Sequence, residues 1–132
     1  MIKGIARKRI GDRWGQGHYG ASRGSRTHNG IDYVLHCGTT VLSPVEGTVT
    51  KIGYPYSDDL SYKYIQITSD DGFQHRIFYV EPSIGLESFV KKDSAIGTVQ
   101  DLEKRYEGIT PHCHYEIKNP EGKFIDPETY ND

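Results

Sequence analysis

The sequence of 132 residues is poor in sulfur and in long apolar stretches: it has two cysteines, one methionine and one tryptophan. Two cysteines are too few to define a redox compartment. No stretch approaches the roughly 20 apolar residues that a membrane-spanning helix needs. The first residues carry positive charge with no apolar segment behind them, so we expect no standard signal peptide and no export by that route.

Helical periodicity is also weak, whereas turn-forming and β-favouring residues are frequent. Fifteen glycines and ten tyrosines, with 35% hydrophobic and 26% charged residues, favour a turn-rich β protein. Strands are predicted at residues 30–35, 47–53, 62–68, 73–79, 94–100 and 112–118, and a hairpin turn at 69–72. The sequence therefore predicts a mainly β fold, with antiparallel sheets in one domain that spans residues 1–132.

The net charge of −2 conceals a basic amino-terminal segment. Residues 1–27 carry +6 and the remaining residues carry −8. Such a segment is typical of nucleic-acid binding, and it could equally be attracted to an anionic cell envelope or membrane surface. Because it is rich in glycine and matches no nucleic-acid-binding fold, we favour a solvated arm that frames a groove and expect no specific nucleic-acid partner.

Two histidines, His112 and His114, lie two residues apart in a segment that alternates like a strand. Side chains at i and i+2 of a strand project from one face about 7 Å apart, so both imidazoles can reach one point. Cys113 then points to the other face, where we expect a buried free thiol; a disulfide with Cys37 would need Cα atoms within about 7 Å. By itself, a His-x-His pair is more often part of a polar strand face than a metal site.

A second cluster contains His28 and Asp32, four residues apart. In an extended strand these two side chains would lie about 13 Å apart, too far to share one ion through bonds of about 2 Å. The chain must therefore bend between them, and Gly30 tolerates the dihedral angles of such a bend. Imidazole nitrogens and a carboxylate oxygen suit zinc better than calcium or magnesium. Three ligands from the two clusters would form a zinc site of the catalytic kind, with one position open to water.

Four segments, in chain order, resemble the motifs of the M23 zinc endopeptidases, the lysostaphin and LytM-like group that cleaves peptide bonds in peptidoglycan. They are residues 28–32 (His-x-x-x-Asp), 38–49 (Gly-Thr-x-Val-x-x-Pro-x-x-Gly-x-Val), 90–97 and 111–116 (Pro-His-x-His-Tyr-Glu). In the third segment Asp93 and Ser94 replace the family's usual Gly-Asp step. The resemblance covers about residues 11–128 and implies a LytM/lysostaphin-like fold, related to the barrel-sandwich hybrid, whose sheets form a groove.

The resemblance makes His28, Asp32 and His114 the ligands of one zinc ion per chain. His112 becomes a catalytic residue beside the metal. This division agrees with the chemistry, because a hydrolytic zinc site needs an open coordination position and a nearby group that exchanges protons or stabilises the tetrahedral intermediate. If all four side chains bound the ion, the site would be closed and structural.

The chain departs from the family where a further catalytic histidine is usual, in a Tyr-x-His-Leu segment. The matching residues are Tyr79-Val80-Glu81-Pro82, so Glu81 stands in place of that histidine. A glutamate can accept a proton from metal-activated water, as in the His-Glu-x-x-His peptidases, which makes Glu81 the candidate general base. His75 is no obvious substitute, since it would lie about 20 Å away in a straight strand. The alternative is that Glu81 is a solvated charge at a strand end.

These expectations favour a monomeric zinc metalloendopeptidase that hydrolyses stem peptides or cross-links of bacterial peptidoglycan. It would act in the cell wall, in the periplasm or outside the cell. A phage-encoded enzyme released by a pore or carried on the virion would fit, as would a domain trimmed from a longer protein.

Two other classes of function are alternatives to this enzyme. The first is an inactive M23-like protein that binds or scaffolds the cell wall, with chemistry lost at Glu81; the retained ligand set of the metal speaks against it. The second is a lipoyl or biotinyl carrier domain, suggested by the glycine turns near residues 43–49 and 90–93. A carrier needs a modifiable lysine in a Met-Lys-Met or Asp-Lys-Ala tripeptide, and neither occurs.

Overall fold

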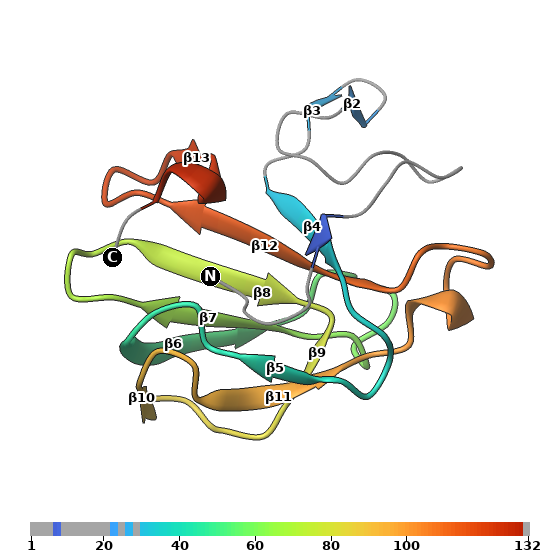
Figure 1. Cartoon of the computed structure of the whole chain (residues 1–132), viewed down its shortest axis with the longest axis horizontal. Coiled ribbons are helices and arrows are strands. Elements are labelled where there is room, and N and C mark those ends of the chain that lie inside the picture. The colour runs from blue at the N-terminus through green and yellow to red at the C-terminus, as the bar shows by residue number, and fades with distance from the viewer. Residues whose placement is uncertain (1–6, 9–21, 24–25, 28–29, 131–132) are drawn as a thin grey trace.

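The computed structural model describes residues 7–8, 22–23, 26–27 and 30–130, and antiparallel sheets dominate this part of the chain (Figure 1). The large sheet has eight strands in the order β1-β4-β12-β8-β7-β6-β10, and β13 pairs with β12 outside that path. Its strands are β1 (Arg7–Lys8), β4 (Ile31–Val34), β6 (Gly47–Gly53), β7 (Tyr64–Thr68), β8 (Gln74–Phe78), β10 (Phe89–Val90), β12 (His112–Lys118) and β13 (Phe124–Ile125).

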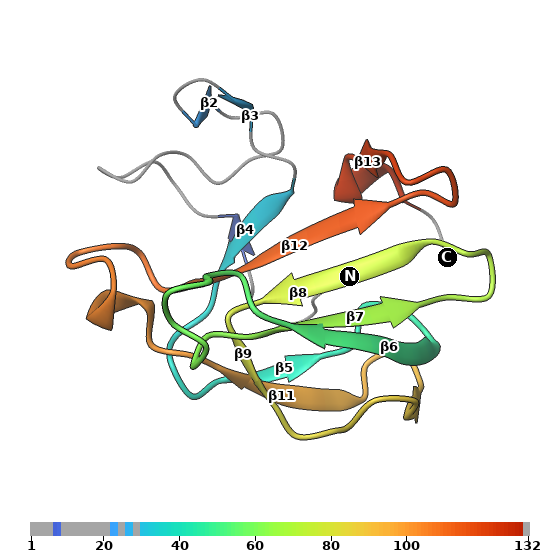
Figure 2. The same cartoon turned by 180° about the vertical axis from the view of Figure 1, so that it is seen from behind.

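The second sheet has three strands in the order β5-β11-β9, and a third sheet is the hairpin β2-β3. These strands are β5 (Thr40–Leu42), β11 (Ala95–Val99), β9 (Val80–Pro82), β2 (Ser22–Arg23) and β3 (Arg26–Thr27); the two 3₁₀ helices are η1 (Leu102–Lys104) and η2 (Pro127–Thr129). Figures 1 and 2 show β5, β11 and β9 together, next to the β6 and β7 side of the large sheet. No helix of the described residues is long and apolar enough to cross a membrane.

The hydrophobic core is shared by the large sheet and the three-stranded sheet. Ile77, Ile65 and Val49 from the large sheet and Val41 and Ile96 from the small one belong to one buried cluster. Burial of these β-branched side chains contributes about 1.5–3 kcal/mol each, which makes the contact between the sheets the main source of stability.

Strand β12 alternates between this core and a polar face. Cys113, Tyr115 and Ile117 are at most 1% exposed and lie in the core cluster. His112 and His114 therefore project from the other face, together with Glu116, because successive side chains of a strand alternate. The free thiol predicted for Cys113 is confirmed: Cys113 is buried, Cys37 is exposed, and neither forms a disulfide.

The prediction of a mainly β fold with antiparallel sheets is confirmed, and each of the six predicted strands overlaps an observed strand. The turn at 69–72 is confirmed as well, since the Gly72 amide donates to the Ser69 carbonyl at 2.9 Å and Gly72 has a φ of +84°. The short strands β1, β2, β3, β5, β9, β10 and β13 were not predicted. Most of the basic arm at residues 1–27 lies outside the described residues, so the role expected for it stays a prediction, as does the extent of the domain.

Gly30 lies where the backbone passes close to β12. A Cβ atom at this position would overlap the Tyr115 carbonyl oxygen and come within 2.9 Å of the His114 ring. A clash with backbone cannot be relieved by a change of rotamer, so β4 and β12 would have to separate. Glycine is therefore required here by the close packing of two strands that carry candidate site residues.

Gly30→Ala should destabilise the protein by about 1–3 kcal/mol and disturb His114, because the added methyl group has no space. Gly85→Ala is the matched control, since a Cβ at Gly85 meets nothing within 4 Å. Urea unfolding of both variants checks this expectation. Equal stability of the two variants would contradict the packing described for Gly30.

Candidate active site

The candidate site is built on the pairing of β12 with β4. In this register His114 lies directly opposite Asp32, and His112 lies opposite Val34. The His114 Nδ1 atom is 3.0 Å from the Asp32 Oδ1 atom. Asp32 is only 2% exposed, so its carboxylate is a buried charge that needs hydrogen-bond partners or a cation. Two of the three predicted metal ligands are thus in contact.

His112 lies on the other oxygen of the same carboxylate. Its Nε2 atom is 3.6 Å from Asp32 Oδ2, and its imidazole is 4% exposed. The Nδ1 atom is 2.7 Å from the Thr110 carbonyl oxygen. A carbonyl can only accept, so Nδ1 carries a hydrogen and donates it. This bond fixes the ring and turns Nε2 toward Asp32 and the site.

The charge state of His114 follows from its two carboxylate neighbours. Burial alone would lower the pKa of this imidazole, because it disfavours the charged form. Hydrogen bonds to Asp32 and Glu116 outweigh burial and raise the pKa from 6.5 to about 9. The metal-free site at neutral pH therefore holds a proton where the predicted ligand set would hold a cation.

His28, the third predicted ligand, lies outside the described residues. Within the part of the chain that the structure describes, no group of three or more His, Cys, Asp and Glu side chains is arranged to hold a metal ion. The described donors, Asp32 and His114, are one carboxylate and one imidazole in contact, which are ligand types that zinc accepts. The role of His28 as the third ligand stays a prediction.

Glu81, the candidate base, is not brought together with the histidines. Its side chain is 57% exposed, and both carboxylate oxygens lie 3.2–3.3 Å from the Lys63 ammonium. It belongs to β9, which pairs with β11 in the small sheet, whereas His112 and His114 belong to the large sheet. The catalytic role of Glu81 stays a prediction, and in this arrangement the side chain is a solvated member of an ion pair.

Two aromatic residues at the end of β8 line the histidines. The Phe78 ring packs edge to face on His114, with ring centres 5.1 Å apart, and the Tyr79 ring packs the same way on His112 at 5.6 Å. Tyr79 has a φ of 71°, which is uncommon for a residue other than glycine. Its backbone is held on both sides, since its amide donates to Lys63 O and its carbonyl accepts from Gln100 N, both at 2.8 Å. This backbone conformation orients Tyr79 toward His112.

Tyr79 connects the site to a cluster of tyrosines from two loops. Its ring stacks on Tyr56, whose hydroxyl donates to the Tyr79 hydroxyl at 3.3 Å. Tyr56 also packs against Tyr106, and the Arg105 guanidinium lies 3.7 Å above the Tyr56 ring. Burial raises the pKa of Tyr79 to about 12, so its hydroxyl stays protonated at neutral pH. The cluster places several packed aromatic rings beside His112.

Glu116 is a site residue that the sequence analysis left without a role. It is 7% exposed, and its Oε1 atom accepts a hydrogen bond from His114 Nε2 at 2.9 Å. Its other oxygen lies 3.6 Å from Arg76 Nη1 on the neighbouring strand. The alternation of β12 could have placed Glu116 beside His114, since Glu116 follows His114 by two residues and shares its face. The sequence could not show that Arg76 lies opposite.

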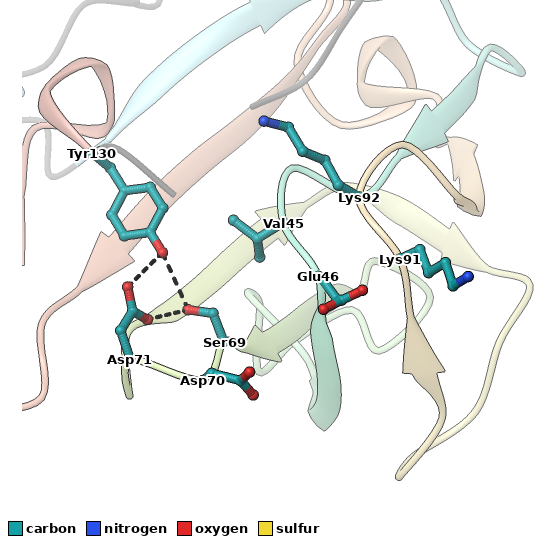
Figure 3. Close-up of a pocket in the computed structure, with 8 residues that line it drawn as sticks. All are labelled: Val45, Glu46, Ser69, Asp70, Asp71, Lys91, Lys92 and Tyr130. Carbon is teal, nitrogen blue, oxygen red and sulfur yellow. Dashed lines mark hydrogen bonds between the residues drawn. The ribbon is translucent and has the colours of Figure 1, made fainter.

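A separate pocket of about 500 Å³ lies at the other end of β7 and β8. It is lined by Val45, Glu46, Ser69, Asp70, Asp71, Lys91, Lys92 and Tyr130 (Figure 3). Figure 3 shows the two lysine ammonium groups pointing in different directions, so the charges do not converge on one point. The Tyr130 hydroxyl donates to Asp71 at 2.7 Å, and the Ser69 hydroxyl donates to the same carboxylate. These bonds tie the last described residues to the β7–β8 turn, which is a structural role.

Proteins with similar sequences include one from a mammal and one from a bacterium. Over 105 residues the chain is 34% identical to "Leukocyte cell-derived chemotaxin-2" of Mus musculus, a match that covers 80% of this chain and 69% of the relative. Over 107 residues it is 28% identical to an "Uncharacterized metalloprotease" of Haemophilus influenzae, covering 79% of this chain and 21% of that protein.

Solved structures with the same fold include two that are described as peptidase-family proteins. The catalytic domain of the prophage-encoded M23 protein EnpA from Enterococcus faecalis superposes with a TM-score of 0.67 at 22% identity, covering 89% of this chain and 91% of that domain. The antimicrobial peptidase lysostaphin from Staphylococcus simulans gives a TM-score of 0.71 at 19% identity, covering 94% and 49%. At these identities the likeness establishes the fold.

The sequence profile of peptidase family M23 matches residues 26–127, which is most of the chain. The matched range contains His28, Asp32, Glu81, His112 and His114, the residues predicted for the site. The family that the motifs resembled is therefore established, and the chain belongs to peptidase family M23.

Proposed function

We propose that the protein is a zinc-dependent endopeptidase that cleaves stem peptides or cross-links of bacterial peptidoglycan. The observation that carries the proposal is the contact of His114 and His112 with the two oxygens of one buried carboxylate, Asp32. Membership of the M23 family supports a peptidase. Lysostaphin, which has the same fold, is described as an antimicrobial peptidase, and this agrees with action on bacteria.

In this proposal His28, Asp32 and His114 would hold one zinc ion per chain. When bound, zinc would supply a Lewis acid that polarises the scissile carbonyl and lowers the pKa of a bound water. The chain's own residues prepare this position. Asp32 neutralises the cation in a buried setting, and its contact with His114 brings an oxygen and a nitrogen donor to one point.

His112 is proposed to move protons or to stabilise the oxyanion during hydrolysis. Its Nδ1 hydrogen is committed to the Thr110 carbonyl, so Nε2 is the atom left to exchange a proton with water or with the leaving amine. The Tyr79 ring against one face of the site limits the rotation of this imidazole. An imidazole held in one orientation is suited to general acid or base catalysis.

Glu81 remains the sequence-based candidate for the base that activates water. Its ion pair with Lys63 would have to open, or the substrate would have to approach from that side, for the carboxylate to act.

The protein is further proposed to be a monomer that acts in the cell wall, in the periplasm or outside the cell, and a phage gene is one origin that would fit. The basic arm at residues 1–27 would frame the groove of a single domain.

An inactive cell-wall-binding or scaffold protein is the second candidate function. The observation that favours it is the exposure of Glu81 and the pairing of its carboxylate with Lys63. The contact between Asp32 and His114 speaks for a working metal site. Assays of metal content and hydrolysis separate the two functions.

His112 and His114 are expected to differ when each is replaced by alanine. His114→Ala removes a ligand, so zinc binding should weaken severely. His112→Ala should keep zinc and reduce peptidoglycan hydrolysis by about 10²- to 10⁴-fold, because an acid, base or oxyanion group is lost. Zinc content by mass spectrometry and release of amino groups from several wall types are the measurements. Equal zinc loss in both variants would show that His112 is also a ligand. Full zinc retention in His114→Ala would contradict the assignment of His114 as a zinc ligand.

Glu81→Gln tests the general base. If Glu81 accepts the proton from water, this nearly isosteric change should lower hydrolysis by about 10²-fold or more while zinc and fold are kept. Lys63→Met is the matched control, because it breaks the same ion pair and leaves the carboxylate in place. If both variants retain wild-type hydrolysis, Glu81 has no part in the reaction. Glu81→His, which restores the usual family residue, should retain measurable activity, and a gain of activity over an inactive wild type would favour the scaffold.

The metal-free protein should lose stability as the pH rises from about 6.5 to 9. The folded state keeps a proton on His114 up to a pKa of about 9, whereas the unfolded chain releases it near 6.5. The folded state thus binds more protons in this window. The contribution of this proton to stability, on the order of 3 kcal/mol, is complete below the window and lost above it. Urea unfolding with a chelator at several pH values is the measurement. His114→Gln should flatten this slope; an unchanged slope would assign it to other groups.

A further inference from the structure

Glu116 and Asp32 lie on different sides of the His114 imidazole. The imidazole is held between the two carboxylates: Nδ1 is 3.0 Å from Asp32 Oδ1, and Nε2 is 2.9 Å from Glu116 Oε1. The two nitrogens of an imidazole point in different directions. A cation shared by His114 and Asp32 must therefore lie on the Nδ1 side, whereas Glu116 contacts the opposite nitrogen, Nε2.

The Glu116 carboxylate is itself anchored from the neighbouring strand. In the pairing of β12 with β8, Glu116 lies opposite Arg76, and the Arg76 Nη1 atom is 3.6 Å from Glu116 Oε2. The Arg76 Nε hydrogen is donated to Gln66 Oε1 at 2.9 Å. Gln66 in turn donates to the Thr50 hydroxyl at 2.9 Å. These hydrogen bonds and the ion pair link β12, β8, β7 and β6 on the polar face and leave Glu116 little freedom to turn away from His114.

The bond between Glu116 and His114 is shorter than the ion pair between Glu116 and Arg76. Glu116 is 7% exposed, so both oxygens need partners, and each oxygen has a different one. If Glu116 served only to neutralise Arg76, its second oxygen would not need a histidine at 2.9 Å. The arrangement matches the pairing in which a metal-bound histidine donates its other ring hydrogen to a carboxylate.

We propose that Glu116 is a positioning residue that keeps the hydrogen of His114 on Nε2, so that Nδ1 is the nitrogen offered to zinc. This inference rests on the zinc site proposed above. Glu116 touches neither zinc nor substrate and acts through the tautomer and orientation of His114. Arg76 and Gln66 hold Glu116 in place for this role.

The experiment combines zinc affinity with nitrogen NMR of the full chain. In zinc-loaded wild type, the His114 signals should show a protonated Nε2 and a metal-bound Nδ1. Zinc affinity, measured by competition with a chelator, should fall about 10- to 100-fold in Glu116→Ala. Glu116→Gln, which keeps an oxygen acceptor, should recover part of that loss. Glu121→Gln is the matched control, because Glu121 is an exposed glutamate in the turn that follows β12.

The outcomes separate this inference from the proposed function. Zinc bound to His114 through Nε2 in the wild type would overturn the role of Glu116 and leave the zinc peptidase intact, and this result does not depend on the folding of any variant. Unchanged zinc affinity in a folded Glu116→Ala would overturn it as well. A wild type that binds no zinc would overturn the zinc site itself and this inference with it.

Discussion

The register in which β12 pairs with β4 on one side and β8 on the other is the constraint on which the site depends. It sets His114 opposite Asp32 and opposite Phe78, and it sets Glu116 opposite Arg76. A shift of one residue would move Cys113 and Tyr115 out of the core and turn both histidines into it. Such a shift would cost much folding free energy, because buried apolar side chains would leave the core. The hydrophobic face of β12 therefore fixes the geometry of the polar face. Stability and chemistry are thus determined by alternate residues of one strand.

The polar face is unusual because most of its charged groups are buried. Asp32, His112 and Glu116 are each at most 7% exposed. Burial of a carboxylate is costly unless it gains charged or hydrogen-bonding partners, and each of these carboxylates contacts histidine. In the metal-free protein the proton on His114 compensates part of this negative charge, and a bound cation would do so when it replaces that proton. In the proposed zinc site, metal binding would therefore displace a proton from His114.

Much of the fold was predictable because strands such as β6 and β12 have strong alternation and clear turns at their ends. The bounds predicted for these two strands, residues 47–53 and 112–118, agree with those observed. The two-residue strand β10 and the proline-containing β9 have too few residues for a period to show. For the candidate site, His112, His114 and Asp32 were predicted from motif spacing, and the structure brings these three side chains together. Glu116 could have been found from alternation, but Arg76 and Tyr79 could not, since cross-strand partners and a positive φ depend on tertiary packing.

The central claim is that this chain carries an open zinc centre formed by two imidazoles and one carboxylate. X-ray absorption at the zinc edge of the zinc-loaded full chain tests it most directly, because the method reports which atoms surround the metal. The account predicts only nitrogen and oxygen neighbours near 2.0–2.2 Å, with two imidazole groups and one water among them. Sulfur at about 2.3 Å, from Cys37 or Cys113, or a closed shell of four protein ligands would contradict it.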